Sequence, residues 1–328
     1  MEINGKTVLY KVRVGSFLYG TSTPESDEDY LGVFVPSPKD YLGLNKVEQI
    51  SDSTKDSTED RRNTIEDIDC TYYSLPKFLR LLLNNNPNII EMLFVNNENI
   101  VHLEYPFDQI LSNPEWFVSS RVQHSFAGYA YSQRKKLIIK KERFQGLQKT
   151  IQILEGFHNY QILDPKHKLD IVLVDILNQH LKYYKGLKNN TESFHVGLPT
   201  KIIYEKLVAE YERYGWRVHT DSFAKVGYDT KFGYNLIRLL WEGKELIKTG
   251  KLTFPLSDEI QNVVSNIRNC YVTYTELLEL YDVYKNQVDK AVESCTLPRT
   301  PKWKIVNNWL VEANIGFMRE YLKEYYDE

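Results

Sequence analysis

The chain has 328 residues, of which 42% are hydrophobic and 26% are charged, enough for a folded core in one large or two modest domains. The 41 basic and 44 acidic residues nearly cancel, so the net charge of −3 gives no general attraction for nucleic acid. The three cysteines are far apart and lack zinc-site spacing, which argues against a disulfide framework or a zinc site and favours a cytoplasmic location. Signal-peptide and membrane-spanning patterns are not found, so no membrane association is predicted.

The first third of the chain predicts strands. Residues 6–14 (KTVLYKVRV) are rich in β-branched and aromatic side chains and predict a strand that ends at Gly15. Residues 29–36 (DYLGVFVP) predict a second strand. The polar residues 45–64 predict an exposed loop or hairpin. Residues 65–73 (IEDIDCTYY) alternate between apolar and polar side chains and predict a third strand.

Helical patterns dominate from about residue 75 to the end. Leu79, Leu82 and Leu83 form an apolar stripe at helical spacing, and the run from Asn84 to Pro87 ends it. The sequence therefore divides into a mixed N-terminal part, residues 1–110, and a helical part, residues 111–328.

A candidate site lies between the first two predicted strands, in VGSFLYGTSTPESDEDYLGVFVP (residues 14–36). A strand, a glycine-serine turn and the start of a helix leave backbone N–H groups that favour phosphate oxygens. The residues expected there are Gly15, Ser16, Gly20 and Thr21. Because residues two apart on a strand share a face, Asp27 and Asp29 present two adjacent carboxylates.

Adjacent carboxylates repel each other unless a cation lies between them, and Mg²⁺ prefers such ligands together with substrate phosphates. Asp69, on the third predicted strand, is the expected third ligand and would allow two ions to bind. Asp67 shares a face with Asp69, which leaves the identity of the third ligand open. The alternative is that the acidic cluster only caps a turn in solvent.

These residues resemble the signature of the DNA polymerase β-type nucleotidyltransferase superfamily, in which Gly-Ser is followed by two aspartates. The longer strings GSFLYGTSTPESDEDYLGVFVP and DCTYYSLPKFLRLLLNNNPNIIEMLF are similar to its RlaP-like group, associated with RNA repair. The blocks GYAYSQRKKL (128–137) and YDTKFGYNLIRLL (228–240) extend the resemblance. Two positions depart from it: Asn85 stands where the group usually has glycine, and Asn235 where histidine is common.

The resemblance implies an α+β fold, in which a small mixed β-sheet carries Asp27, Asp29 and Asp69 as catalytic metal ligands. Flanking helices and a largely helical C-terminal part, residues 111–328, would close the nucleotide and acceptor cleft. It also implies Mg²⁺-dependent transfer of a nucleoside monophosphate from a nucleoside triphosphate to an acceptor hydroxyl, with an RNA 3′ end as the favoured acceptor. The expected nucleotide contacts are Gly15, Ser16, Tyr19, Gly20, Thr21, Lys135, Tyr228, Lys231 and Arg238.

Several features have two interpretations. The basic run at 134–144 suits RNA or triphosphate, but it equally predicts the solvated face of a helix. Lys231 and Arg238 lie seven residues apart, which suits a phosphate clamp or an ordinary helix surface. Glu91 is predicted to pair inside the fold. The alternative functions are modification of a protein or small molecule, and binding of nucleotide or RNA without catalysis.

Overall fold

The computed structural model describes residues 1–24, 26–44, 46–54, 67–156, 166–180, 194, 196–217 and 220–327. The chain forms two compact units. Unit 1 consists of Met1–Tyr131, Asn235–Asn266 and Leu278–Glu328. Unit 2 consists of Ser132–Tyr234 and Ile267–Leu277. This division differs from a single boundary at residue 110, because long C-terminal segments belong to the same unit as the sheet.

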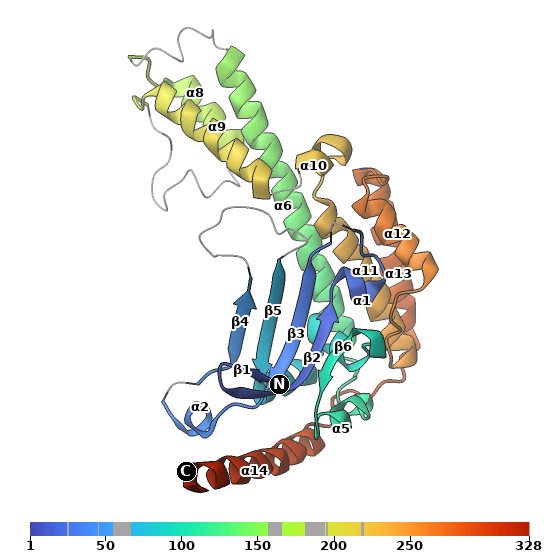
Figure 1. The fold of residues 1–328 in the computed structure, drawn as a ribbon. Helices are drawn as coiled ribbons and strands as arrows, with labels where there is room; N and C mark the ends of the chain where they lie inside the picture. Colours follow the sequence, from blue (N-terminus) through green and yellow to red (C-terminus); the bar gives the residue numbers. More distant parts are fainter. Residues whose placement is uncertain are drawn as a thin grey trace. The chain divides into compact units, whose positions relative to one another are not determined.

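Unit 1 contains a six-stranded mixed sheet in which the neighbour order is β1-β2-β3-β5-β4, and β6 also pairs with β2 (Figure 1). β3 and β5 are parallel, whereas the other described strand pairs are antiparallel. This arrangement confirms the predicted α+β class. The strands are β1 (Glu2–Ile3), β2 (Lys6–Val14), β3 (Glu28–Phe34), β4 (Gln49–Ser53), β5 (Ile68–Ser74) and β6 (Ile100–Leu103).

The three predicted strands correspond to β2, β3 and β5, with boundaries that agree to within a few residues. In the polar segment predicted as a loop or hairpin, β4 pairs antiparallel with β5, as a hairpin requires. Residues 55–66 of that segment lie outside the described residues. The short strands β1 and β6 were not predicted, because two to four residues carry too little periodicity to distinguish a strand from a loop.

Helices supply the rest of unit 1. Those that lie wholly within it are α1 (Ser16–Tyr19), α2 (Pro38–Leu42), α3 (Leu75–Leu83), α4 (Pro87–Ile90), α5 (Asp108–Leu111) and α14 (Trp303–Asp327), with 3-10 turns η1 (Glu91–Leu93), η2 (Asn97–Asn99) and η3 (Pro114–Trp116). Four more helices contribute residues to both units: α6 (Val122–Gly156), α11 (Thr230–Thr249), α12 (Asp258–Arg268) and α13 (Tyr274–Glu293).

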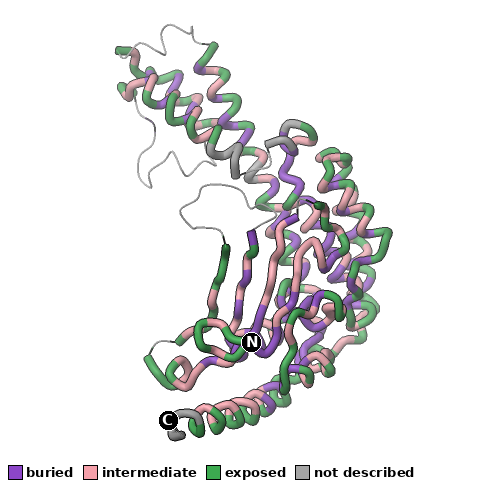
Figure 2. The backbone as a smooth tube through the Cα atoms, in the orientation of Figure 1, coloured by how far each residue is buried: buried purple, intermediate pink, exposed green. Residues whose placement is uncertain are grey.

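The sheet buries side chains on both faces. On one face the Tyr10 ring stacks on Phe107 at a centroid distance of 4.7 Å, and its hydroxyl donates to the Met92 carbonyl at 2.9 Å. The other face carries a smaller cluster of Val8, Phe34, Cys70 and Tyr72. Figure 2 shows β2, β3 and β5 coloured mainly as buried or intermediate, whereas β4 is mainly exposed and much of α14 is intermediate or exposed.

Gly32 on β3 is required by this second cluster. It pairs in register with Tyr72 on β5, and a Cβ atom at Gly32 would overlap the Tyr72 ring. The ring therefore lies across the backbone of β3, where only glycine leaves room for it. The Lys11 ammonium stands over the same ring and over that of Tyr30, at 5.8 and 4.7 Å from their centroids.

The predicted helix after the third strand is confirmed, including the break in its apolar stripe. α3 buries Leu79 and Leu82 and ends at Leu83. Asn85 then adopts a left-handed conformation with φ of 51°. Its amide donates to the carbonyls of Leu82 and Phe117 at 3.0 and 2.7 Å. Glycine adopts this backbone region readily and asparagine tolerates it, which explains why asparagine can replace the glycine usual at this position.

Unit 2 is helical in its described part. It contains α8 (Ile171–His180), α9 (Thr200–Arg217) and α10 (Thr220–Val226), together with parts of α6, α11, α12 and α13. Its apolar core comprises Leu147, Leu154, Leu169, Leu173, Leu177, Phe194, Ile203 and Leu207. Among the helices of either unit that the structure describes, none has the length and apolar character needed to cross a membrane.

Candidate active site

Asp29 and Asp69 lie side by side in the sheet of unit 1. The two residues pair in register on the parallel strands β3 and β5, so their side chains point to the same face. Adjacent strands are about 4.8 Å apart, which brings the two carboxylates within reach of one cation. Both residues are partly exposed. The Ser53 hydroxyl of β4 donates to Asp69 Oδ1 at 2.6 Å, so a neutral group orients this carboxylate.

The alternative third ligand, Asp67, differs from Asp69 in its access to solvent. Asp67 is only 3% exposed and precedes β5, whereas Asp69 is partly exposed within the strand. A dissolved ion reaches a partly exposed carboxylate more readily than a buried one. This difference favours Asp69, which the sequence motif also favoured. Asp27 lies just before β3 and is partly exposed as well.

Gly15 brings the chain backbone directly against Asp29. It follows β2 with φ of 68° and ψ of −143°, a combination that is essentially restricted to glycine. A Cβ atom at Gly15 would lie 3.1 Å from Asp29 Oδ2. Because glycine has no side chain, the turn and the carboxylate can approach each other closely. The glycine-serine turn and Asp29 of the sequence motif are therefore neighbours.

The segment after Gly15 is a single helical turn. α1 comprises four residues and begins at Ser16, so only a few peptide dipoles add up along it and its helix dipole is weak. The Thr21 N–H donates to the Ser16 carbonyl at 2.9 Å and closes the turn. A Cβ atom at Gly20 would lie 2.8 Å from Gln261 Nε2, so this glycine packs against α12.

A buried ionic cluster fixes the end of α1. The Arg238 guanidinium donates to Glu91 Oε1 at 2.7 Å and to both oxygens of Glu242 at 2.7 and 2.9 Å. The Tyr19 hydroxyl donates to Glu91 Oε2 at 2.7 Å, and Arg238 also stacks on the Tyr19 ring. Glu91, Arg238 and Glu242 are at most 4% exposed. Arg238 and Tyr19, both predicted nucleotide contacts, therefore interact with each other, and the predicted internal pairing of Glu91 is confirmed.

Two carboxylates share one guanidinium in this cluster. Burial is the largest influence on Glu242 and raises its pKa well above the ordinary value; the charge of Arg238 acts in the opposite direction, and the charge of Glu91 raises the pKa further. Asn235 adds a neutral contact, because its side-chain oxygen accepts from Arg238 Nη2 at 3.3 Å. The asparagine that replaces the usual histidine thus supports the arginine.

The other predicted nucleotide contacts belong to unit 2. Tyr228 is fully buried, and its hydroxyl donates to the Val272 carbonyl at 2.9 Å. Burial raises the pKa of Tyr228. Lys231 is exposed at the start of α11, and its backbone N–H donates to Asp229 Oδ1 at 3.0 Å. Lys135 is exposed on α6, where Leu137 and Phe144 of the same basic run are buried. The run therefore belongs to a helix that buries these apolar side chains and exposes Lys135.

The donor set of the aspartates fits a hard divalent cation, because carboxylate oxygens are the ligands that Mg²⁺ and Mn²⁺ prefer. In the described part of the chain, however, no group of three or more His, Cys, Asp or Glu side chains is already arranged around a common metal position. The register places Asp29 and Asp69 next to each other in the sheet.

Two features of the region were not predicted. Ser53 lies in the polar segment, where the sequence contains no signal that distinguishes it from the neighbouring serines. Glu242 was also missed, although its spacing of four residues from Arg238 on one helix is a recognisable ion-pair signal.

The mixed sheet, the neighbouring Asp29 and Asp69, and the turn at Gly15 fit the nucleotidyltransferase site that the sequence motif predicts. A family model described as RlaP, RNA repair pathway DNA polymerase beta family, matches residues 2–304. The chain belongs to this family, which is a polymerase β-type nucleotidyltransferase family.

A phage protein is similar to most of the chain. It is an uncharacterized 38.9 kDa protein of the nrdC-mobD intergenic region of Enterobacteria phage T4, 30% identical over 277 residues. The similarity covers 77% of this chain and 80% of the phage protein. No solved structure matches the chain.

Proposed function

We propose that this protein is a Mg²⁺- or Mn²⁺-dependent nucleotidyltransferase that transfers a nucleoside monophosphate from a nucleoside triphosphate to the 3′ hydroxyl of an RNA. The observation that carries the proposal is the parallel register of Asp29 and Asp69, with Gly15 against Asp29. Paired carboxylates beside a side-chain-free turn can bind metal-associated phosphates. Membership of the RNA repair family supports both the reaction class and the acceptor.

Asp27, Asp29 and Asp69 hold the divalent ion in this proposal. When bound, the ion neutralises charge on the phosphates and activates the acceptor hydroxyl. Gly15 leaves space beside Asp29 for a phosphate oxygen, and the Ser53 hydroxyl keeps the Asp69 carboxylate oriented. The acceptor oxygen bonds to the α-phosphorus, the α–β phosphoanhydride bond breaks, and pyrophosphate leaves as the hydroxyl proton is released.

The remaining predicted contacts take two different roles. Ser16 follows Gly15 at the start of α1, and the Thr21 N–H bonds back to the Ser16 carbonyl to close the turn. In this proposal the hydroxyls of both residues contact the phosphates. Tyr19 and Arg238 act indirectly, because their cluster with Glu91 holds α1 in place below that turn. Lys135 and Lys231 of unit 2 remain predicted contacts to nucleotide or RNA. Tyr228 is fully buried and its hydroxyl bonds to the Val272 carbonyl, so we assign it a packing role instead. If the exposed lysines hold RNA, its affinity must fall steeply with salt concentration.

A transfer assay with a matched pair of variants tests the proposal. The protein is incubated with each α-labelled nucleoside triphosphate, Mg²⁺ or Mn²⁺, and RNA with either a free or a blocked 3′ hydroxyl. We expect label on the free RNA only. Asp29→Asn keeps the side-chain size but removes a ligand charge, so transfer should fall at least about 100-fold. The melting temperature of the metal-free variant should change little.

Asp52→Asn is the control. Asp52 is an exposed carboxylate on β4 that pairs with Cys70, on the sheet face opposite to Ser53 and Asp69. It should retain normal transfer. The proposal fails if Asp29→Asn retains near-normal transfer or if no nucleotide is transferred to any acceptor. Label on added protein or small molecules instead of RNA would keep the metal site but reject the RNA acceptor.

A further inference from the structure

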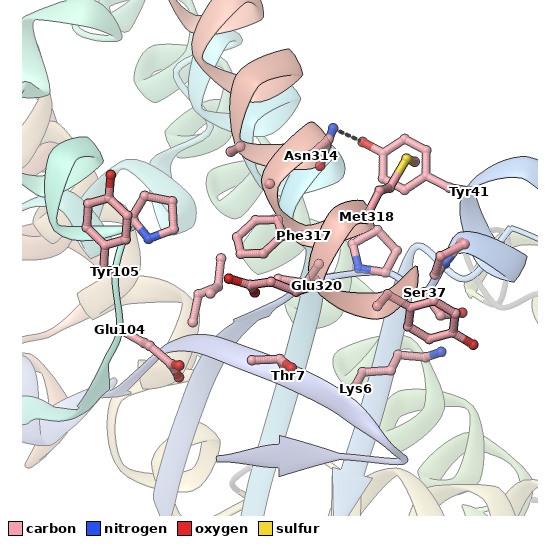
Figure 3. A pocket seen from close by; sticks show the side chains of 18 of the residues that line it. Lys6, Thr7, Ser37, Tyr41, Glu104, Tyr105, Asn314, Phe317, Met318 and Glu320 are labelled. Carbon is pink, nitrogen blue, oxygen red and sulfur yellow. Dashed lines mark hydrogen bonds between the residues drawn. The ribbon is translucent and has the colours of Figure 1, made fainter. Parts of the chain in front are cut away.

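One cavity of unit 1 lies far from Asp29 and Asp69. It has a volume of about 630 Å³ and is lined by the start of β2, the segment around α2, the segment that follows β6, and α14 (Figure 3). Lys6 lines it, whereas Asp29 pairs with Val14 at the other end of β2. Eight residues of strand separate Lys6 from Val14, or about 26 Å. The cavity is therefore not part of the candidate active site.

The polar groups on the α2 side of the cavity interact with one another. Lys6 forms an ion pair with Asp40, and the side chains of both residues are nearly buried. The Ser37 hydroxyl also donates to Asp40, at 2.8 Å. The Tyr41 hydroxyl accepts from Asn314 of α14 at 2.6 Å, a bond drawn in Figure 3. Lys6 is the only basic side chain among the described residues that line the cavity, and Asp40 neutralises its charge.

Acidic and aromatic side chains line the rest of the cavity. Glu104, Glu312 and Glu320 are exposed carboxylates of the lining. Within the described residues, Glu312 and Glu320 make no hydrogen bond or ion pair, whereas Glu104 lies 3.2 Å from His102 Nε2. The aromatic lining residues are Tyr41, Tyr105, Trp309, Phe317 and Tyr321. In Figure 3, Phe317 and Met318 lie between Tyr105 on one side and Tyr41 on the other.

This lining selects the charge of a ligand. Three carboxylates against one neutralised lysine repel phosphates, so the cavity is unsuited to a nucleotide or an RNA backbone. Carboxylates together with aromatic faces attract guanidinium and ammonium groups through charge-assisted hydrogen bonds and cation–π contacts. The volume lies within the range of about 300–1,000 Å³ that is usual for small-ligand sites.

We propose that this cavity binds a guanidinium or ammonium group carried on an apolar stem. Glu312 and Glu320, which stand eight residues apart on α14, each offer a carboxylate to a cationic group, and Phe317 and Tyr105 cover the stem. Such a group occurs both in free polyamines and in the arginine and lysine side chains of a polypeptide, and binding measurements distinguish these two sources.

Calorimetric titration at low salt tests the proposal with two kinds of cation. The free cations are agmatine and spermidine. The polypeptide probe is a glycine peptide containing arginine and lysine, and its neutral counterpart contains citrulline and glutamine at the same positions. We expect saturable binding of at least one cationic probe and no binding of the neutral peptide. If the free cations bind more tightly than the charged peptide, the ligand is a free polyamine. If the charged peptide binds more tightly, the ligand is an arginine or lysine side chain of a polypeptide.

Two double variants locate the binding. Glu312→Gln with Glu320→Gln should lower the affinity for the bound probe at least tenfold, and Tyr105→Ala should lower this affinity to a smaller extent. Glu279→Gln with Glu293→Gln removes the same charge from exposed positions of α13 and should leave the affinity unchanged. The proposal is overturned by absence of saturable binding, by equal weakening in both double variants, or by tight binding of the neutral peptide.

Discussion

Unit 1 contains two pairs of neighbouring carboxylates whose surroundings differ. Glu91 and Glu242 are buried, and Arg238 donates hydrogen bonds to both. Asp29 and Asp69 are partly exposed neighbours in the sheet, and a neutral hydroxyl donates to Asp69. Burial of a charge is costly unless the fold supplies its counter-charge, whereas a partly exposed pair remains accessible to an ion from solution. Burial thus distinguishes Glu91 and Glu242, which support the fold, from Asp29 and Asp69, which are proposed to bind the catalytic metal ion.

The largest expected effect comes from removal of the counter-charge in the buried pair. Arg238→Met leaves Glu91 and Glu242 buried together without a guanidinium, and should reduce the free energy of unfolding by about 3–5 kcal/mol. Chemical denaturation measures this change.

Arg80→Met provides the matched control. Arg80 pairs with Glu48, but its side chain is 59% exposed, so its loss should cost at most about 1 kcal/mol. Equal losses in the two variants would contradict the view that burial decides the importance of the arginine.

A smaller effect is expected at the exposed pair from Gly15→Ala. The glycine-only backbone conformation should cost about 1–3 kcal/mol of stability. In addition, the new Cβ atom would lie 3.1 Å from Asp29 Oδ2 and displace that carboxylate. The rise in melting temperature on addition of Mn²⁺ with a nucleoside triphosphate should therefore shrink or vanish.

Gly5→Ala separates the two causes. Gly5 has a similar φ of 69°, but nothing lies within 4 Å of a Cβ atom placed there. This variant should be destabilised yet keep its full response to metal and nucleotide. A full response in Gly15→Ala would show that the turn and Asp29 are not coupled.

The smallest effect is expected for Glu242→Gln, because glutamine keeps the size of the side chain and its amide oxygen can still accept a hydrogen bond from Arg238. Burial raises the folded-state pKa of Glu242, so its contribution to stability is fully present below the ordinary glutamate pKa of about 4.3. This contribution is lost as the pH rises through the folded-state pKa. The wild-type unfolding free energy should therefore decline with rising pH more steeply than that of the variant, and parallel profiles would contradict the assignment.

Much of the sheet could be predicted because its signals are local. Alternating side chains and the glycine or proline at strand ends predicted β2, β3 and β5. The sequence also indicated the break after α3, where Asn85 adopts the left-handed conformation. β4 was predicted only as one arm of a loop or hairpin, because its polar residues become a strand through pairing with β5.

The pairing of distant segments required the tertiary structure. No local pattern relates Tyr19, Glu91 and Arg238 to one another. Tyr19 is 72 residues away from Glu91 in the sequence, and Arg238 is 147 residues away from it. Nor does any local pattern relate α14 to α2, which Asn314 and Tyr41 connect at the cavity.

The sequence by itself determined the residue types of the candidate active site, the strands that carry them and the resemblance to a nucleotidyltransferase family. These properties depend on neighbours a few residues apart, whose spacing sets which side chains share a face. Only the tertiary structure decided that Asp69 lies beside Asp29, that Arg238 is enclosed by carboxylates, and that α14 closes an acidic aromatic cavity. Such contacts depend on strand register and on burial, which arise when segments far apart in the chain pack together.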